Sequence, residues 1–444
     1  MKMPKLPPDV SKLQEQALQS GRIGKILQVA FSGEGLRSNQ YPHWEKLRYR
    51  QPPGDLSSEE WWFAIKIQRS NLQKKLPLVD KNSKPFSYHL PDPAPESLHD
   101  VDLGAGGVIE MPDPITNPET RDRYIVASLI EEAFTSSQLE GAASTREVAK
   151  EMIRAGRKPA TEGEQMVLNN YMTMQWIRKI EDQPLNQQMI CDIHRKITER
   201  TLSDPNDAGH FRKPDRSIVV DDQYGTVLHE PPDADQLKER MSAMCDFANG
   251  KTPKHFVHPV VRSIILHFWL AYDHPFADGN GRTARALFYW SMLRHKFFLF
   301  EYISISTVIL KSPTKYGRAF LYTESDDNDL TYFVLYHLKV INQAIQELHK
   351  YVRRKTQEMR AVESRLKRLA TLNHRQRALV IHALRHPQHR YTVTSHKTSH
   401  DVVYQTSRMD LLDLEQKGLL EKHKVGRTYY YHPVDNLQSI LSNI

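Results

Sequence analysis

Two apolar helical patterns flank a short polar turn between residues 259 and 293. The first pattern has apolar residues at Val260, Ile264, Ile265, Phe268 and Trp269. This is the spacing of a helix that faces a protein core. A proline follows His274, which disfavours the helical conformation there and predicts the end of this helix. A second, mostly apolar and helix-forming run begins at residue 283, so residues 279–281 lie where a turn enters a helix N-terminus.

Helical patterns recur on both sides of this pair. They cover residues 120–135, 145–155, 161–180 and 186–200 before it, and residues 313–322 and 330–348 after it. Between them, residues 217–229 hold two short β-prone segments separated by turn residues. The patterns predict a mainly α fold, with a helical core and one small β-hairpin.

The positive charge of the chain is concentrated near its C-terminus. Residues 351–444 hold 17 Lys and Arg against 8 Asp and Glu, whereas the whole chain has 61 against 53. The first 350 residues are therefore close to neutral. Any contact with nucleic acid is expected in the C-terminal part.

Cysteine usage and hydropathy exclude several classes of protein. Only Cys191 and Cys245 occur, without the spacing of a zinc site or a disulfide framework. No apolar run reaches the roughly 18 to 20 residues that span a bilayer, and the first residues lack the apolar segment of a signal peptide. We therefore expect a cytoplasmic protein with no membrane partner.

The turn at residues 279–281 has the composition of a phosphate site. Gly279, Asn280 and Gly281 would present free backbone N–H groups at a helix N-terminus, where the helix dipole also favours an anion. Arg282 and Arg285 lie three residues apart on one face of that helix. Both guanidinium groups can donate paired hydrogen bonds to a polyphosphate.

Two more residues add chemistry to this anion site. Asp278 lies so close to it that a cation such as Mg²⁺, which binds through carboxylates and substrate phosphates, is expected between them. His274 has an ordinary pKa near neutrality and can take a proton from an attacking hydroxyl.

Residues 274–285 read His-Pro-Phe-x-Asp-Gly-Asn-Gly-Arg-x-x-Arg, and this run resembles the full signature of Fic-domain proteins. The resemblance implies a protein adenylyltransferase that moves AMP from ATP to a Ser, Thr or Tyr hydroxyl of a target protein or of itself. It makes His274 the general base, Asp278 the Mg²⁺ ligand and residues 279–285 the phosphate site.

A second motif ends the helix predicted before the core. Ser136, Glu140 and Gly141 fit Ser-x-x-x-Glu-Gly, which resembles the inhibitory motif of Fic proteins and places an inhibitory helix at about 121–141. By this resemblance Glu140 pairs with Arg285, the guanidinium that the γ-phosphate of ATP otherwise needs. The alternative is a glutamate that only ends a helix.

The resemblance also assigns residues beside the nucleotide. The flap at Thr226, Val227, Leu228 and His229 would clamp the target segment by main-chain pairing, and Tyr316 would line the adenine pocket. The alternatives are an ordinary structural hairpin and a surface tyrosine.

The chain divides into four predicted parts. Residues 1–110 form an N-terminal extension, whose Trp44, Trp61 and Trp62 predict packing on a larger body rather than an independent core. Residues 111–348 form the Fic catalytic domain, 349–370 a charged helical linker, and 371–444 a C-terminal domain that resembles a winged helix-turn-helix.

In the winged helix, residues 402–408 would be the recognition helix, with Gln405, Ser407 and Arg408 facing DNA bases. Lys422, Lys424 and Arg427 would lie on the wing and meet phosphates. Winged helices also serve as protein-docking or dimerisation modules, so a homodimer is an alternative partner. Three other functions stay open. The protein could be a DNA-binding regulator with a nucleotide-sensing or self-modifying Fic domain, it could transfer another nucleotide, or it could remove AMP.

Overall fold

The computed structural model describes residues 1–32, 40–106, 118–214, 219–221, 225–368, 371–425 and 428–442. It confirms the mainly α fold: three two-stranded antiparallel sheets accompany the helices over the described residues. Contacts divide the chain into two compact units, Met1–Gly107 with Ser128–Ile345, and Val108–Ala127 with Gln346–Ile444. The domain boundaries predicted near residues 110 and 370 fall outside the described residues, and that at 348 stays a prediction.

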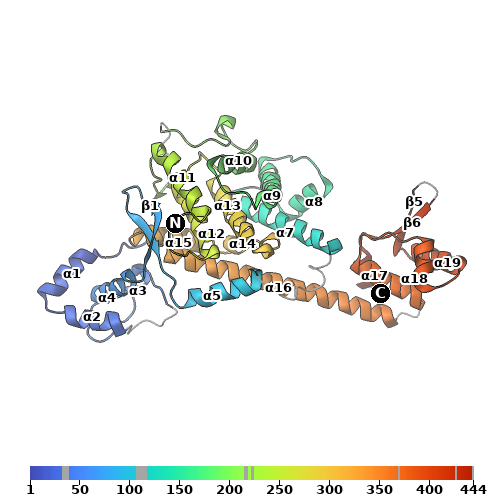
Figure 1. The fold of residues 1–444 in the computed structure, drawn as a ribbon, viewed down its shortest axis with the longest axis horizontal. Coiled ribbons are helices and arrows are strands. Elements are labelled where there is room, and N and C mark those ends of the chain that lie inside the picture. Colours follow the sequence, from blue (N-terminus) through green and yellow to red (C-terminus); the bar gives the residue numbers. More distant parts are fainter. Residues whose placement is uncertain are drawn as a thin grey trace. The chain divides into compact units, whose positions relative to one another are not determined.

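The N-terminal helices of the first unit share a hydrophobic core. These helices are α1 (Val10–Gln19), α2 (Ile23–Ser32), α3 (Trp44–Leu47) and α4 (Ser58–Ser70), gathered together in Figure 1. Trp44, Trp61 and Trp62 are buried in a cluster with Leu13, Ile26 and other residues of α1 and α2. The segment therefore has a local hydrophobic core, because the helices on either side of the tryptophans fold back to cover them, and it belongs to the same compact unit as residues 128–345.

Buried polar contacts also tie this segment to the rest of the first unit. Lys66 on α4 donates to Asp326 at 2.7 Å, and Arg69 donates to the Tyr332 hydroxyl at 2.9 Å. Strands β1 (Lys74–Val79) and β2 (Pro85–Tyr88) form an antiparallel hairpin, and helix α5 (Pro93–Val101) follows. The segment thus combines a local core with a buried ionic attachment.

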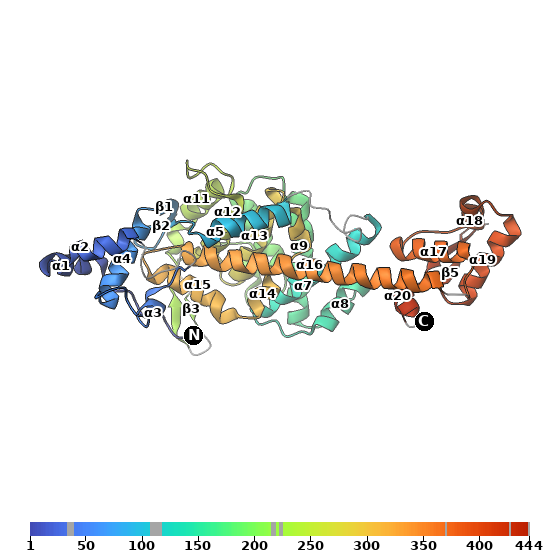
Figure 2. The ribbon, with the colours of Figure 1, turned by 90° about the horizontal axis from the view of Figure 1, so that it is seen from below.

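The remaining helices of the first unit surround α12 (Pro259–Asp273) and α13 (Asn280–Arg294). Nearly every residue of these two helices is buried, and Figures 1 and 2 both place them among the other helices. The surrounding elements are the end of α7 (Pro118–Leu139), α8 (Arg146–Ala155), α9 (Glu162–Ile180), α10 (Gln187–Ile197), α11 (Leu237–Ala248), α14 (Ile305–Leu310), α15 (Pro313–Ser325) and the start of α16 (Thr331–Arg368). The turn between α12 and α13 is therefore held by a rigid, buried framework.

The predicted flap is a two-stranded antiparallel hairpin of β3 (Val220–Asp221) and β4 (Val227–His229). Short single-turn helices complete the first unit: η1 (Asp102–Gly106), η2 (Pro205–Asp207), η3 (Ala234–Gln236) and η4 (Phe298–Glu301). Within the described residues, no helix combines the length and apolarity needed to cross a membrane.

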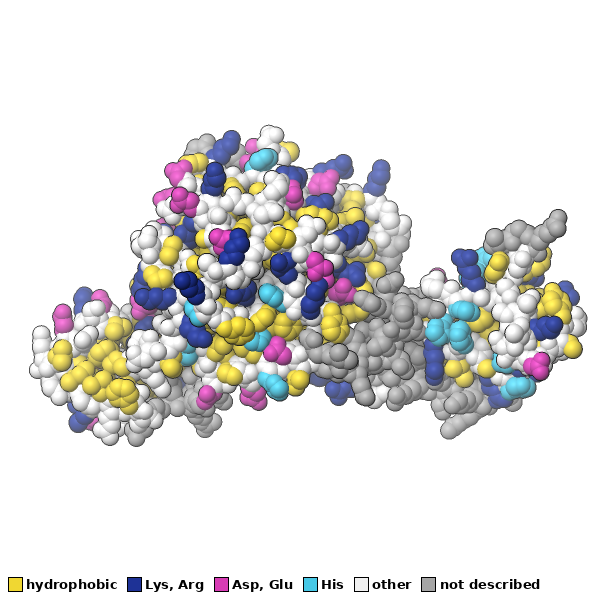
Figure 3. Space-filling view, in the orientation of Figure 1, with side chains coloured by type: hydrophobic (Ala, Val, Ile, Leu, Met, Phe, Trp, Pro, Cys, Tyr) yellow, Lys and Arg dark blue, Asp and Glu magenta, His cyan; other side chains and the backbone are white. Residues whose placement is uncertain are grey.

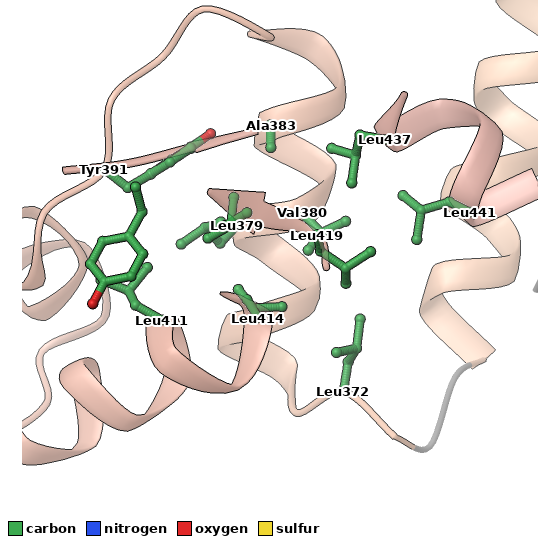
Figure 4. Close-up of a cluster of buried hydrophobic side chains, with 12 residues drawn as sticks. Leu372, Leu379, Val380, Ala383, Tyr391, Leu411, Leu414, Leu419, Leu437 and Leu441 are labelled. Carbon is green, nitrogen blue, oxygen red and sulfur yellow. The ribbon is translucent and has the colours of Figure 1, made fainter. Parts of the chain in front are cut away.

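Within the second unit, described residues 371–433 contain three helices followed by a hairpin. They are α17 (His374–Arg385), α18 (Val393–His400), α19 (Tyr404–Gln416), β5 (Leu420–Val425) and β6 (Thr428–Pro433), and a final helix α20 (Leu437–Ser442) follows. Leu379 and Val380 of α17 pack with Leu411 and Leu414 of α19 in one hydrophobic core (Figure 4). Helix α18 was not predicted, because its Ser-, Thr- and His-rich sequence buries only His396.

Candidate active site

The loop between α12 and α13 is closed by its own polar groups. His274 ends α12 in the left-handed conformation, with φ 45°, and Gly279 precedes α13 with φ 78°. The side-chain amide of Asn280 accepts from the Phe276 N–H and donates to the Phe276 carbonyl, both at 2.9 Å. Asn280 therefore holds the loop with both of its amide atoms, whereas the sequence predicts it only as part of the phosphate site.

Burial sets the protonation state of His274. Loss of solvation lowers the pKa of its imidazole to about 4, so the ring is neutral at physiological pH. Nδ1 lies 3.4 Å from the Ala271 carbonyl, which favours the tautomer with a proton on Nδ1 and a free lone pair on Nε2. A neutral ring with this lone pair is suited to accept a proton.

His194 on α10 holds the loop in place and was not predicted from the sequence. Its Nδ1 accepts from the Gly209 N–H at 2.9 Å, so Nε2 carries the proton and donates to the Asp278 carbonyl at 2.8 Å. The ring stacks on Phe276 with centroids 3.7 Å apart. Burial lowers the pKa of His194 to about 4, which keeps this tautomer neutral.

Arg212 is a second residue that sequence reasoning missed. Its Nε donates to the His274 carbonyl at 2.9 Å, and its backbone N–H donates to the Pro275 carbonyl at 2.8 Å. These contacts hold the main chain at the start of the loop. No sequence signal points to Arg212 or His194, because each acts on a loop more than sixty residues away through main-chain atoms.

The two arginines of α13 are buried and differ in their partners. Arg282 donates through Nη1 to the Ile197 carbonyl at 3.2 Å, while its buried Nε has no hydrogen-bond partner among the described residues. Asp278 lies on the surface, its side chain 65% exposed and 3.7 Å from Arg282. Arg285 donates through Nε to the Ser136 hydroxyl at 2.8 Å and through Nη2 to the Ser136 carbonyl at 2.9 Å.

Glu140 reaches the same guanidinium. Its Oε1 accepts from Arg285 Nη2 at 2.8 Å, and the Glu140 side chain is 27% exposed. Burial alone would raise the pKa of Glu140, but the charge and hydrogen bond of Arg285 outweigh burial and hold the pKa below its usual value. The carboxylate also covers the glycine turn, because a Cβ atom on Gly281 would lie only 2.3 Å from Oε1.

The end of α7 places Glu140 at this point. Gly141 has φ 86°, a left-handed conformation that stops the helix. Two turns earlier, the buried carboxylate of Glu132 accepts from the Tyr289 hydroxyl at 2.7 Å and from the Ser304 hydroxyl at 2.8 Å. Glu132 therefore anchors the end of α7 to the helical core, and it carries no sequence motif that would have identified it.

The remaining predicted residues lie nearby in the first unit. Tyr316 is half-buried, its hydroxyl is 2.9 Å from His267 Nε2, and burial raises its pKa to about 12. On the flap, Thr226 and Val227 are exposed and Leu228 is half-buried. The roles of Tyr316 and of the flap in binding adenine and the target stay predictions.

His229 ties the flap to α12. Its Nε2 lies 2.7 Å from the Tyr272 carbonyl and its Nδ1 lies 2.7 Å from Glu324 Oε2. Both partners are acceptors, so both ring nitrogens donate. Burial alone would lower the pKa of His229, but Glu324 and the Tyr272 carbonyl together raise it.

The described residues contain no group of three or more His, Cys, Asp or Glu side chains that could hold a metal ion by themselves. A cavity of about 370 Å³ lies between residues 159–165 and 200–203, and no predicted site residue lines it. The candidate site at the turn thus consists of main-chain groups and two buried arginines.

In the second unit, Gln405, Arg408 and Lys424 are exposed. Ser407 is fully buried and donates its hydroxyl to the Val393 carbonyl at 2.6 Å. Its predicted role in contacting DNA bases is therefore wrong, because it faces α18. Arg427 lies outside the described residues.

Comparison with known proteins is consistent with this geometry. Residues 184–292 match the model of the Fic/DOC family. The protein adenylyltransferase Fic of Nematostella vectensis is 28% identical over 185 residues, covering 39% of this chain and 40% of that protein. The protein of the same name from Aedes aegypti is 33% identical over 105 residues, covering 24% of this chain and 19% of that protein. The chain thus spans less than half the length of these curated relatives.

A solved structure of a Fic family protein from Desulfovibrio desulfuricans G20 is 18% identical, with coverage of 76% of this chain and 96% of that chain and a TM-score of 0.49. The assignment rests on the sequence matches. They define the class: a helical domain whose residues 184–292, including the 274–285 turn, follow the Fic/DOC pattern. Residues 184–292 of this chain are thus similar to the Fic/DOC family.

Proposed function

We propose that this protein is a protein adenylyltransferase, which transfers AMP from ATP to a Ser, Thr or Tyr hydroxyl of a target protein and of itself. The observation that carries the proposal is the placement of a neutral, half-buried His274 just before a glycine turn that is followed by two buried arginines. The adenylyltransferase names of the relatives support the same activity.

The α13 N-terminus provides the proposed phosphate site. The N–H groups of residues 279–281 stand at the positive end of a 15-residue helix. Arg282 adds a buried Nε with no partner among the described residues, which is a donor available to an anion. Arg285 supplies a second guanidinium, which would meet the γ-phosphate when Glu140 withdraws.

The residues fit a Mg²⁺ ion carried by the nucleotide. Asp278 is an exposed carboxylate beside the anion site, and Mg²⁺ typically takes one or two carboxylates and completes its shell with phosphates and water. Asp278 would hold the ion, whose charge would offset that of the phosphates.

The reaction needs one proton acceptor and one leaving group. The target hydroxyl attacks the α-phosphorus as the bond from this phosphorus to the bridging oxygen of the β-phosphate breaks, so pyrophosphate leaves. The hydroxyl proton passes to Nε2 of His274. Because the pKa of His274 is about 4, transfer is expected late, when the forming P–O bond has already acidified the hydroxyl. Most of the rate gain comes from positioning and charge stabilisation.

We also propose that Glu140 restrains this activity. It neutralises Arg285 and fills the space above Gly281, so it competes with a phosphate for both. A single charge-assisted hydrogen bond contributes about 1.5–3 kcal/mol. This is enough to keep most molecules inactive while allowing a partner or self-modification to release them.

Transfer of labelled AMP from ATP tests the proposal. We expect weak labelling of the wild-type protein, strong labelling of Glu140→Gly, and none of Glu140→Gly/His274→Ala. Glu131→Ala is the matched control, because it removes a surface glutamate of the same helix that pairs with Arg146 rather than with Arg285. Label that persists without His274 would overturn the base assignment. Equal labelling of wild type and Glu140→Gly would overturn the restraint.

A further inference from the structure

Helices α18 and α19 of the second unit are arranged as a helix-turn-helix. The three residues between them include Asp401, which has φ 49° and turns the chain sharply. The Ser407 hydroxyl bonds to the Val393 carbonyl and fixes α19 against the start of α18. Tyr391 pairs with Tyr431 of β6, which joins the hairpin to the same body. This order of elements matches DNA-binding modules in which the second helix of the pair enters the major groove.

One face of α19 is exposed to solvent at its N-terminal end. Tyr404 is 56% exposed, and Gln405 and Arg408 are exposed on the same turn of helix. The adjoining face is anchored in the core through Leu411 and Leu414. The exposed side chains are of the types that read base edges, since Arg pairs with guanine and Gln with adenine.

One acidic residue of α19, Asp410, is neutralised inside the unit, whereas Glu415 lies beside Lys422. Asp410 is 4% exposed and accepts from Arg375 Nε at 2.7 Å. Its other partners are Asn373 at 2.7 Å and His396 at 3.2 Å. The negative charge of Asp410 therefore does not oppose an anion at the exposed face.

The β5–β6 hairpin carries two lysines on the side whose Tyr431 is buried in the core of the unit. Lys422 and Lys424 stand opposite Tyr431 and Tyr429 in the register, so all four lie on one side of the hairpin. Lys422 lies 4.6 Å from the Tyr429 ring centroid and 4.0 Å from Glu415 of α19, which brings this side of the hairpin next to that helix. Among charged side chains, Lys, Arg and His predominate on the face of this unit visible in Figure 3.

We propose that one surface of the second unit binds double-stranded DNA. This surface, the α19–hairpin face, consists of Tyr404, Gln405, Arg408, Lys422, Lys424 and Tyr429. Helix α19 would lie in the major groove, with Gln405 and Arg408 at base edges. Lys422 and Lys424 would lie along the phosphates, where they release counterions. Charge complementarity, together with the polar planar groups of Gln405 and Arg408, favours a duplex over an acidic protein segment. The activity goes beyond AMP transfer and does not depend on it.

Fluorescence anisotropy of the full-length protein tests this inference. A random library of duplexes of about 30 base pairs, long enough for two half-sites, is first used to select a preferred sequence. Affinity for that sequence and for a scrambled duplex is then measured between about 50 and 200 mM salt. The variants are Arg408→Ala and Lys422→Ala/Lys424→Ala. Arg390→Ala is the matched control. This exposed arginine lies close enough to His432 for its charge to lower the pKa of that histidine, and His432 is on the other side of the hairpin from Lys422 and Lys424.

Three results are expected. The wild-type protein binds the selected duplex with steep salt dependence. Removal of both lysines makes the slope of log affinity against log salt shallower by about 2. Arg408→Ala reduces discrimination against the scrambled duplex by about 5- to 150-fold, and Arg390→Ala changes neither quantity.

The inference is overturned by any of three findings: no duplex binding, equal or tighter binding to single strands of the same sequence, or duplex binding that the three substitutions on the α19–hairpin face leave unchanged. Circular dichroism of each variant shows whether a loss of binding reflects unfolding. If the Arg408→Ala variant unfolds, discrimination is measured with Arg408→Lys instead, because lysine keeps the positive charge but cannot donate the paired hydrogen bonds. Discrimination must then fall while the salt slope stays unchanged.

Discussion

Replacing Glu140 with glutamine removes one negative charge and leaves a side chain of almost the same shape. In the structure, Glu140 Oε1 accepts from Arg285 Nη2 at 2.8 Å, and the guanidinium is 2% exposed. The pair is therefore largely shielded from solvent on the arginine side. A charge-assisted hydrogen bond of this kind contributes about 1.5–3 kcal/mol.

This energy opposes ATP binding only if the γ-phosphate competes with Glu140 for Arg285. The expected gain in ATP affinity for Glu140→Gln is then about 10- to 150-fold. AMP has no γ-phosphate, so its affinity should change little. Isothermal titration calorimetry in the His274→Ala background measures both nucleotides without turnover.

Glu131→Gln serves as the control, because this residue of α7 pairs with Arg146 at 2.8 Å and Lys150 at 2.9 Å on the surface. It should leave both affinities unchanged. Equal gains for AMP and ATP, or no gain for ATP, would refute the competition between Glu140 and the γ-phosphate.

Two further predictions concern the loop. Burial lowers the pKa of His274 to about 4, and Glu140 counteracts this in part, so labelling by Glu140→Gly should stay constant as pH falls from about 8 to 5 and be lost only at or below about pH 4, not near the ordinary value of about 6.5. In urea unfolding, Gly279→Ala should lower the free energy of unfolding by about 1–3 kcal/mol more than Gly156→Ala does. Both glycines have positive φ, but a Cβ atom at Gly279 would lie 2.6 Å from Thr198 Cγ2, whereas a Cβ atom at Gly156 would meet no other residue.

Each of these predictions has a clear contrary result. A fall in initial labelling rates near pH 6.5, in protein shown to be folded by circular dichroism, would mean that His274 is not the proton acceptor. The fold must be checked, since a buried histidine with a lowered pKa also costs stability as pH falls below its unfolded value of about 6.5. Equal urea midpoints for the two alanine variants would mean that the space around Gly279 is not restrictive.

The sequence predicted the parts of the site that depend on neighbouring residues. The turn at 274–285 follows from a proline, two glycines and two helical patterns, all of them local. Glu140 lies 145 residues before Arg285 and was identified through its family motif, and the two side chains meet at 2.8 Å.

The sequence did not reveal the residues that hold the site together. His194 supports the loop through a carbonyl 84 residues away, and Glu132 anchors α7 to hydroxyl groups of α13 and of residue 304. Such contacts depend on the packing of whole helices and leave no periodic signal. The same holds for Ser407, whose small polar side chain could face either solvent or α18.

A crystal structure of Glu140→Gly/His274→Ala grown with ATP and Mg²⁺ would test the central claim most directly. We predict that the triphosphate lies at the start of α13, within hydrogen-bond distance of the N–H groups of residues 279–281, with the γ-phosphate on Arg285. A triphosphate bound elsewhere, or no nucleotide at millimolar ATP, would contradict the proposed site.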